Sequence, residues 1–137
     1  MKQKMVLGVE DVKRMLAAGE AEALRQQWAV TIAIVDDGGH LLSLLRLDGA
    51  SAMTTQIAPG KARTAAISRR ETKFYDDIIN QGRQSFLSVP GVDAMLEGGV
   101  PVMLDGQCIG AVGVSGVKSA EDAQIARAAI AALVPAD

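Results

Sequence analysis

Residues 30–48 read V-T-I-A-I-V-D-D-G-G-H-L-L-S-L-L-R-L-D, and the predicted fold is organised around them. Two apolar runs rich in Val, Ile and Leu flank Asp36-Asp37-Gly38-Gly39, whose residue types tolerate the positive φ angles of tight turns. The stretch therefore predicts a β-hairpin. In the first run, two sets of residues alternate: Val30, Ile32 and Ile34, and Thr31, Ala33 and Val35. Because both sets are largely apolar, we expect a central strand that is covered on both faces.

Apolar periodicity elsewhere predicts helices that cover this sheet. Residues at three- and four-residue spacing favour helices at 9–27, 60–70 and 72–81, and a final helix that begins near 119. Gly8 suits the N-cap of the first helix, and Ser119 with Asp122 resembles a capping box at the start of the last one. Residues 49–59 are expected to form the connection that leads into the helix at 60.

A second hairpin completes the predicted sheet. Asp105-Gly106 is a strong two-residue turn signal between expected strands at 100–104 and 107–115. A further short strand is expected at 84–89. Hairpins make a sheet antiparallel, and the central strand needs helices on both faces. We therefore predict a single α+β domain that spans residues 1–137.

The size and charge of the chain argue against several classes of function. A net charge of −2 and an aromatic content of 3% provide neither a basic surface nor stacking platforms for nucleic acid. The N-terminus has no apolar leader, and no run reaches the roughly 18 apolar residues of a membrane span. We therefore expect a cytoplasmic protein that binds neither nucleic acid nor membrane. The single cysteine, Cys108, excludes an intrachain disulfide and is expected to pack in the core.

Five short motifs stand in order along the chain: I-A-I-V-D-D-G-G-H-L-L at 32–42, R-L-D-G-A at 46–50, K-A-R-T-A-A at 61–66, L-E-G-G-V-P-V at 96–102 and D-G-Q-C-I-G-A-V-G-V-S-G at 105–116. Together they resemble the GlcG/HbpS-like family, small domains named for haem binding or haem degradation, with a relative in the C-terminal domain of PduO-type cobalamin adenosyltransferases. The resemblance implies a profilin-like or Roadblock-like antiparallel sheet of about five strands with helices packed on it. It also implies a homo-oligomer, either a dimer or a higher assembly up to an octamer.

The resemblance implies a small-molecule-binding protein of a catabolic pathway, with haem or another tetrapyrrole as its ligand and no other cofactor. Members of the family are also linked to small organic acids. Two other hypotheses stay open. One is an enzyme (a hydrolase, deaminase or isomerase) that acts on a small carboxylated catabolite, with Lys61, Asp48 or Glu97 as acid or base and Arg46 holding the carboxylate. The other is a structural accessory oligomer.

Charged residues and glycines stand at the ends of the expected elements. If the fold joins these ends, the cations and glycine amides suit a carboxylate or a haem propionate. The alternative is that Arg46 with Asp48, and Lys61 with Glu97, form ion pairs at a surface or an interface. The predicted ligand-binding set is His40, Arg46, Asp48, Lys61, Glu97, Gly98 and Gly99.

His40 is the only histidine of the chain. Imidazole binds haem iron and titrates near neutral pH, so His40 is either an axial haem ligand or a general acid, or else a solvent-exposed turn residue. No other metal site is expected, because the spacings typical of zinc ligands are absent. Met53, Met95 and Met103 carry thioethers that can contact haem iron, although packing is the expected role of these side chains.

Overall fold

The computed structural model describes residues 1–133 and has a four-stranded antiparallel sheet at its centre, in the order β2-β1-β4-β3. The strands are β1 (Thr31–Asp36), β2 (Leu41–Arg46), β3 (Gly99–Leu104) and β4 (Gln107–Ser115). The helices are α1 (Val9–Gln26), α2 (Thr54–Ser68), α3 (Thr72–Asn80) and α4 (Ser119–Ala131), with a short 3-10 helix, η1 (Gln84–Ser88). Both predicted hairpins and the predicted α+β class are confirmed.

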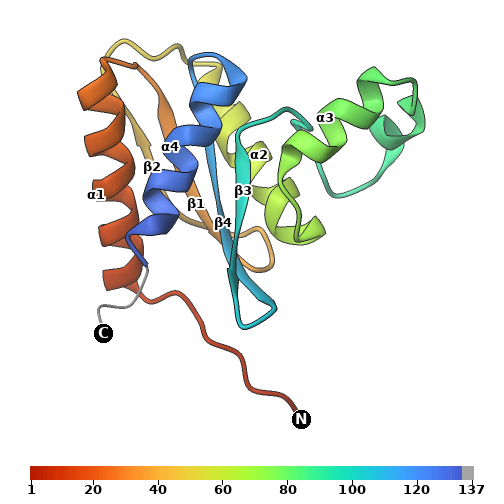
Figure 1. Ribbon diagram of the computed structural model, residues 1–137, viewed down its shortest axis with the longest axis horizontal. Helices are drawn as coiled ribbons and strands as arrows, with labels where there is room; N and C mark the ends of the chain where they lie inside the picture. The colour runs from red at the N-terminus through yellow and green to blue at the C-terminus, as the bar shows by residue number, and fades with distance from the viewer. Residues whose placement is uncertain (134–137) are drawn as a thin grey trace.

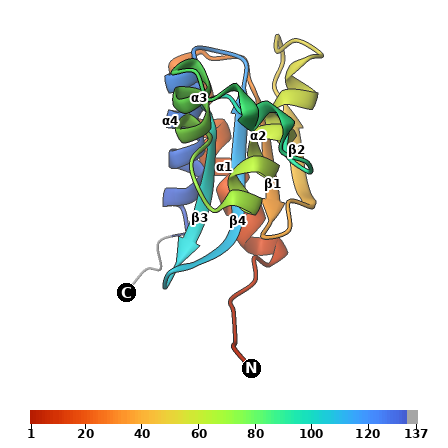
Figure 2. The same cartoon turned by 90° about the vertical axis from the view of Figure 1, so that its right-hand side faces the viewer.

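The helices form a layer on each face of the sheet. Helices α1 and α4 pack together on one face, and α2 covers the other (Figure 1). A second view separates α4 from α2, with β3 and β4 between them (Figure 2). Helix α3 and η1 project beyond the β3 edge of the sheet (Figure 1). None of the helices among the described residues is long and apolar enough to cross a lipid bilayer.

Strand β1 is buried on both faces, as its sequence predicted. Ile32 and Ile34 point into the core beneath α1 and α4, whereas Ala33 and Val35 point toward α2. All four side chains are at most 1% exposed. Since no side chain from Thr31 to Val35 is charged, and Asp36 stands at the end of the strand, β1 can occupy the centre of the sheet without burying an unpaired charge.

The two faces are packed with side chains of different size. Isoleucine and valine fill the side under α1 and α4, but the α2 side is lined mainly by alanines: Ala33, Ala58, Ala62, Ala65, Ala66 and Ala111. Small side chains allow the backbone of α2 to touch the sheet. A Cβ atom added to Gly113 would lie 2.1 Å from the Ala58 carbonyl oxygen and 2.5 Å from the Ala62 nitrogen. Glycine at this strand position is therefore a packing requirement.

Helix α2 begins earlier than the sequence predicted. The sequence indicates a connection up to Pro59, but the helix starts at Thr54 and contains that proline. A proline inside a helix removes one hydrogen bond and crowds the preceding turn. Tertiary contact outweighs this cost here, because the Thr54 hydroxyl is buried against the Thr31 hydroxyl at 2.7 Å and also bonds the Ser51 carbonyl.

Two further local predictions were wrong. The strand expected at 84–89 is η1, which packs Phe86 against Tyr75, so the sheet has four strands rather than about five. Ser119 does not cap α4, since the N-cap is Lys118 and its amide bonds the Glu121 carboxylate at 3.2 Å. In both cases the chain uses contacts that a short sequence pattern does not encode. Gly8, by contrast, does precede α1 as its N-cap.

Replacing Gly113 by alanine tests the close contact between α2 and the sheet. Because the new methyl group would meet helix backbone, we expect Gly113→Ala to lower the free energy of unfolding by at least about 3 kcal/mol. Gly8→Ala is the matched control, since its Cβ would lie an ordinary 3.4 Å from Asp11. It should cost less than about 1 kcal/mol. Urea denaturation of both variants measures the difference, and equal losses would contradict the packing argument.

Candidate functional site

The lysine that the sequence proposed for a ligand pocket is buried in an ion pair. The Lys61 side chain is 3% exposed, and its Nζ donates to the Val114 carbonyl at 2.9 Å and to Asp122 Oδ2 at 3.0 Å. The other oxygen of Asp122 accepts from the Val117 amide at 3.1 Å. Lys61 therefore connects α2, on one face of the sheet, to α4 on the opposite face.

Gly98 makes room for this connection at the end of the sheet. A Cβ atom at Gly98 would lie 2.7 Å from Lys61 Nζ and 2.8 Å from the Val114 carbonyl oxygen. Burial raises the pKa of the Asp122 carboxyl, while the Lys61 ammonium and the Val117 amide act in the opposite direction. Because the ammonium is enclosed by protein partners, its geometry indicates a structural role.

The backbone amides near Lys61 are also occupied. The Gly99 amide donates to Thr72 Oγ1 at 2.8 Å, and the Glu97 amide donates to Asp76 Oδ2 at 3.0 Å. The structure thus brings Lys61, Gly98 and Gly99 together, but the partner of Lys61 is Asp122 rather than Glu97. An anion at this point would have to displace hydrogen bonds that hold α3 to β3.

The remaining predicted residues lie elsewhere on the sheet. Arg46 and Asp48 are at the same end as Gly99, but on the β2 edge, three strands or about 14 Å away. Arg46 Nε donates to the Ala50 carbonyl at 2.9 Å, and no ion pair with Asp48 is formed within residues 1–133. His40 lies at the other end of β2, roughly 20 Å along the strand. The seven residues therefore do not line one pocket within a single chain, and their binding of a ligand stays a prediction.

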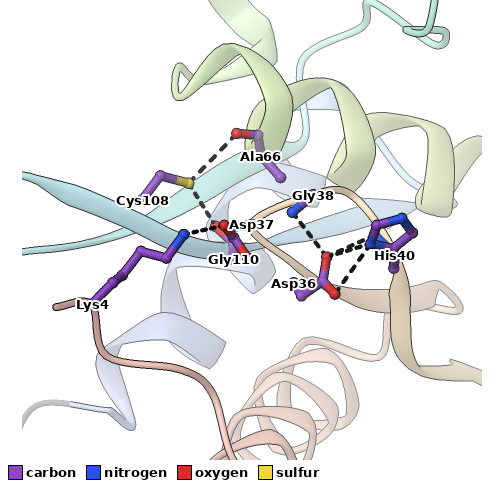
Figure 3. Close-up of polar contacts among 8 residues, drawn as sticks. All are labelled: Lys4, Asp36, Asp37, Gly38, His40, Ala66, Cys108 and Gly110. Atoms are coloured by element: carbon purple, nitrogen blue, oxygen red, sulfur yellow. Dashed lines mark hydrogen bonds and ion pairs between the residues drawn. The ribbon is translucent and has the colours of Figure 1, made fainter. Parts of the chain in front are cut away.

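His40 belongs to the turn between β1 and β2 (Figure 3). Its side chain is 82% exposed, and Nδ1 lies 3.2 and 3.3 Å from the two oxygens of Asp36. Asp36 Oδ1 also accepts from the Gly38 and His40 amides, each at 2.9 Å. The carboxylate therefore organises the turn and orients the ring of His40, which stands open to solvent.

At this same end of the sheet, on the face that carries α1 and α4, lies an apolar cavity of about 400 Å³. The N-terminal segment, the start of α1, the β3–β4 hairpin and the end of α4 surround it. Its lining is Met5, Val6, Leu7, Asp11, Arg14, Val102, Met103, Leu104, Ile109, Ile130 and Leu133. Asp11 and Arg14 are the charged members, and they pair with each other at 2.7 Å. Met5 and Met103 are the methionines among the lining residues, and Met103 is paired with Cys108, whose side chain faces α2.

The sequence analysis missed this cavity and the partner of Lys61. Asp122 shares a helix face with Ile125, Ala126 and Ala129, all of them buried. An acidic residue on a core-facing stripe signals a buried partner, and that spacing was available in the sequence. The sequence contains a weaker signal for the cavity, which is the apolar run at 5–7 ahead of the first helix. Lys4 forms an ion pair with Asp37, which connects the N-terminal segment to the β1–β2 turn (Figure 3).

Cys108 is a packed core residue, as expected. It is 6% exposed, and its Sγ lies 3.3 Å from the Gly110 carbonyl oxygen and 3.6 Å from that of Ala66 (Figure 3). Burial raises the pKa of its thiol, which disfavours the reactive thiolate. Within residues 1–133, no cluster of three or more His, Cys, Asp or Glu side chains is arranged to hold a metal ion.

Comparison with known protein families matches residues 7–131 to the family described as Haem degrading protein HbpS-like. The chain belongs to this HbpS-like family. The resemblance indicated by the five sequence motifs is confirmed. Protein GlcG of Escherichia coli (strain K12) is 51% identical over 115 residues, which make up 84% of this chain and 85% of GlcG.

Solved structures share the fold along nearly the whole chain. Klebsiella pneumoniae protein ORFY is 28% identical with a TM-score of 0.91, and the match covers 100% of this chain and 97% of ORFY. A complex of PduOC with haem is 30% identical with a TM-score of 0.85, over 95% of this chain and 96% of PduOC. The HbpS-like architecture thus accounts for all four strands and the helices that cover them.

Neutralising Lys61 tests its structural role in this HbpS-like chain. Lys61→Met keeps the aliphatic stem but leaves the buried Asp122 carboxylate without its counter-ion, and we expect a loss of roughly 3 kcal/mol near pH 7. The loss of the ammonium also raises the pKa of the Asp122 carboxyl further, so the folded variant takes up a proton before the unfolded chain does. Its stability should therefore recover in part as the pH falls toward about 4.

The double variant Lys61→Met/Asp122→Asn is the control for this prediction. It removes both charges while the asparagine oxygen still accepts from the Val117 amide, so most of the stability near neutral pH should return. Chemical denaturation at several pH values measures all three proteins. A Lys61→Met protein as stable as the unmodified chain at neutral pH would show that the pair does not hold the layers together.

Proposed function

We propose that this protein binds haem or a related tetrapyrrole in the apolar cavity between the N-terminal segment and the β3–β4 hairpin. The observation that carries the proposal is the composition of the cavity wall. Its lining is apolar except for Asp11 and Arg14, and it includes Met5 from the N-terminal segment. Such a wall suits a flat apolar ring with a metal at its centre and carboxylates at its edge.

Each part of a haem finds a suitable group in this wall. Thioether sulfur is an axial ligand of haem iron in some proteins, which gives Met5 a chemical role. The Arg14 guanidinium is suited to a propionate, and its side chain is 61% exposed at the rim of the cavity. The volume lies within the range of about 300–1,000 Å³ that is usual for ligand sites. A cavity of this volume covers only part of a haem macrocycle, so the rest of the ring would lie outside the cavity.

His40 fits this cavity poorly as an axial ligand. It does not belong to the cavity lining, and its side chain is almost fully exposed on the β1–β2 turn. An iron bound there would leave most of the macrocycle in water unless a second molecule covered it. The cavity therefore supports a thioether contact better than an imidazole contact.

The comparisons support this proposal from a separate direction. PduOC has been solved as a haem complex, and its chain superposes on this one along nearly the whole length of both. The same scaffold is thus compatible with a bound tetrapyrrole. The buried position of Lys61 argues against its use as an acid or a base on a small catabolite, whereas the same roles for Asp48 and Glu97 stay predictions. A place in a catabolic pathway stays a prediction.

A haemin titration followed by visible absorption tests the proposed function. We expect a saturable, shifted Soret band with the unmodified chain and with His40→Ala. Met5→Leu keeps an apolar wall but removes one sulfur, so it should change the band position, and Arg14→Ala should weaken binding by about tenfold through the lost propionate contact. Leu104 lines the cavity and packs against the core on the same face of the sheet, so Leu104→Trp should block the cavity and abolish saturable binding.

Two outcomes would overturn different parts of the proposal. A band that is lost in His40→Ala but unchanged in Met5→Leu and Leu104→Trp would move the iron contact to the turn. Weak spectra that never saturate with the unmodified chain would reject tetrapyrrole binding altogether. Circular dichroism of each variant confirms that the fold is intact.

A further inference from the structure

The N-terminal segment forms one wall of the apolar cavity without belonging to a helix or to the sheet. Figure 1 shows it extending away from α1 at the end of the sheet that carries the β3–β4 turn. Its first six residues form no backbone hydrogen bond to the rest of residues 1–133. Within the same range, the ion pair between Lys4 and Asp37 is their one polar side-chain contact. This wall of the cavity is therefore attached to the fold at few points.

Two attachments of unequal strength hold the segment. Leu7 is a buried member of the core, and it fills the space that Gly110 leaves open, since a Cβ on that glycine would lie 2.6 Å from Leu7 Cδ1. The pair of Lys4 with Asp37 lies at the surface, where the two side chains are 41% and 44% exposed. The Lys4 ammonium lowers the pKa of the Asp37 carboxyl, so the carboxylate is ionised at neutral pH. Exposed ion pairs contribute little to stability, so the attachment at Lys4 is the weak one.

A second cavity, of about 580 Å³, adjoins the first along this segment. Its lining is Gln3, Lys4, Met5, Leu104, Asp105 and Gln107. Met5 and Leu104 also line the first cavity, so these two residues separate the cavities. Leu104 belongs to β3, whereas Met5 belongs to the weakly attached segment and is 65% exposed. The partition between the two cavities can therefore move on one side.

The combined volume of the two cavities matches a larger ligand than either cavity alone. The first cavity, of about 400 Å³, covers only part of a tetrapyrrole ring. Together with the second, it reaches the upper end of the range that is usual for ligand sites. Segments held by few contacts open at a small cost in free energy. Because Leu7 is fixed in the core, a movement that joins the cavities requires a change only in the residues that precede it.

We propose that ligand binding moves residues 3–6 away from Asp37, joins the two cavities into one site, and transfers the Lys4 ammonium from Asp37 to a carboxylate of the ligand. This inference rests on the proposed function, and it adds Lys4 to the residues that bind the ligand. The exchange keeps the ammonium paired with a carboxylate throughout. Arg14 remains for the second carboxylate of a dicarboxylic tetrapyrrole, and Met5 then lies against the ligand instead of between the cavities.

Two variants of the ion pair test this exchange in a fluorescence titration with protoporphyrin IX and with its dimethyl ester. Asp37→Asn releases Lys4, so it should tighten binding of protoporphyrin IX by about two- to fivefold, the range that an exposed ion pair provides. Lys4→Met also releases the segment but removes the cation, so it should not tighten binding of the acid. The ester has no carboxylate for Lys4, so both variants should tighten its binding by the same factor.

Asp77→Asn is the matched control for the loss of a surface ion pair. Asp77 pairs with Lys73 on α3 at 2.8 Å, and the two side chains are exposed to a similar extent as those of Lys4 and Asp37. This control should leave both affinities unchanged. The turn should also survive Asp37→Asn, because the carboxylate that bonds the turn amides is that of Asp36. Thermal unfolding of each variant checks the fold.

Trypsin digestion tests the movement of the segment without any ligand. Trypsin cleaves the peptide bond that follows Lys4 only when the segment leaves the fold, and mass spectrometry identifies the product. Asp37→Asn should raise the rate of this cleavage by about two- to fivefold, while Asp77→Asn should not change it. An unchanged rate in Asp37→Asn would show that the ion pair does not hold the segment, and would overturn the inference.

The titration separates a failure of this inference from a failure of the proposed function. Saturable binding of protoporphyrin IX with one affinity in the unmodified chain, Asp37→Asn and Lys4→Met would overturn the inference and leave the proposed function intact. Equal tightening of the acid in both variants would overturn the transfer of Lys4 to the ligand. If no variant bound either porphyrin saturably, the proposed function would fail, and this inference with it.

Discussion

The buried ion pair between Lys61 and Asp122 is the constraint on which the arrangement of the layers depends. Desolvating an ammonium and a carboxylate costs several kcal/mol for each ion, so the pair is tolerable only with close geometry and additional hydrogen bonds. Val114 and Val117 supply those bonds through their backbone groups. Since Lys61 is on α2 and Asp122 is on α4, the pair exists only when both helices are seated on their own faces of the sheet.

The alanines of α2 follow from the same constraint. A lysine side chain reaches past the end of the sheet to α4 only if the helix that carries it lies close to the strands. Ala58, Ala62 and Gly113 remove the side-chain volume that would otherwise separate α2 from β4. The K-A-R-T-A-A and L-E-G-G-V-P-V motifs therefore encode a contact between a helix and a sheet. The charged residues and glycines of these two motifs therefore mostly contact other parts of the same chain.

The sequence was most informative where the pattern is local. Alternation in β1 and the D-D-G-G and D-G turns predicted both hairpins, because strand faces and turn angles depend on adjacent residues. The start of α2 was not predictable in this way, since the buried contact between Thr31 and Thr54 joins residues far apart in the chain. The same reason explains η1, whose Phe86 packs on Tyr75 instead of continuing a strand.

The candidate site was less predictable than the fold for a related reason. Charged residues near element ends were taken as one group. However, His40, Arg46 and Asp48 lie along β2 and its two ends at one edge, whereas Gly98 and Gly99 lie at the start of β3 at the other edge. Whether such residues meet at one edge or lie at opposite edges depends on the strand order. Strand order is a property of the whole sheet and cannot be read from a local pattern. The cavity residues were missed because Met5 and Arg14 come from the N-terminal region while Met103 comes from a distant hairpin.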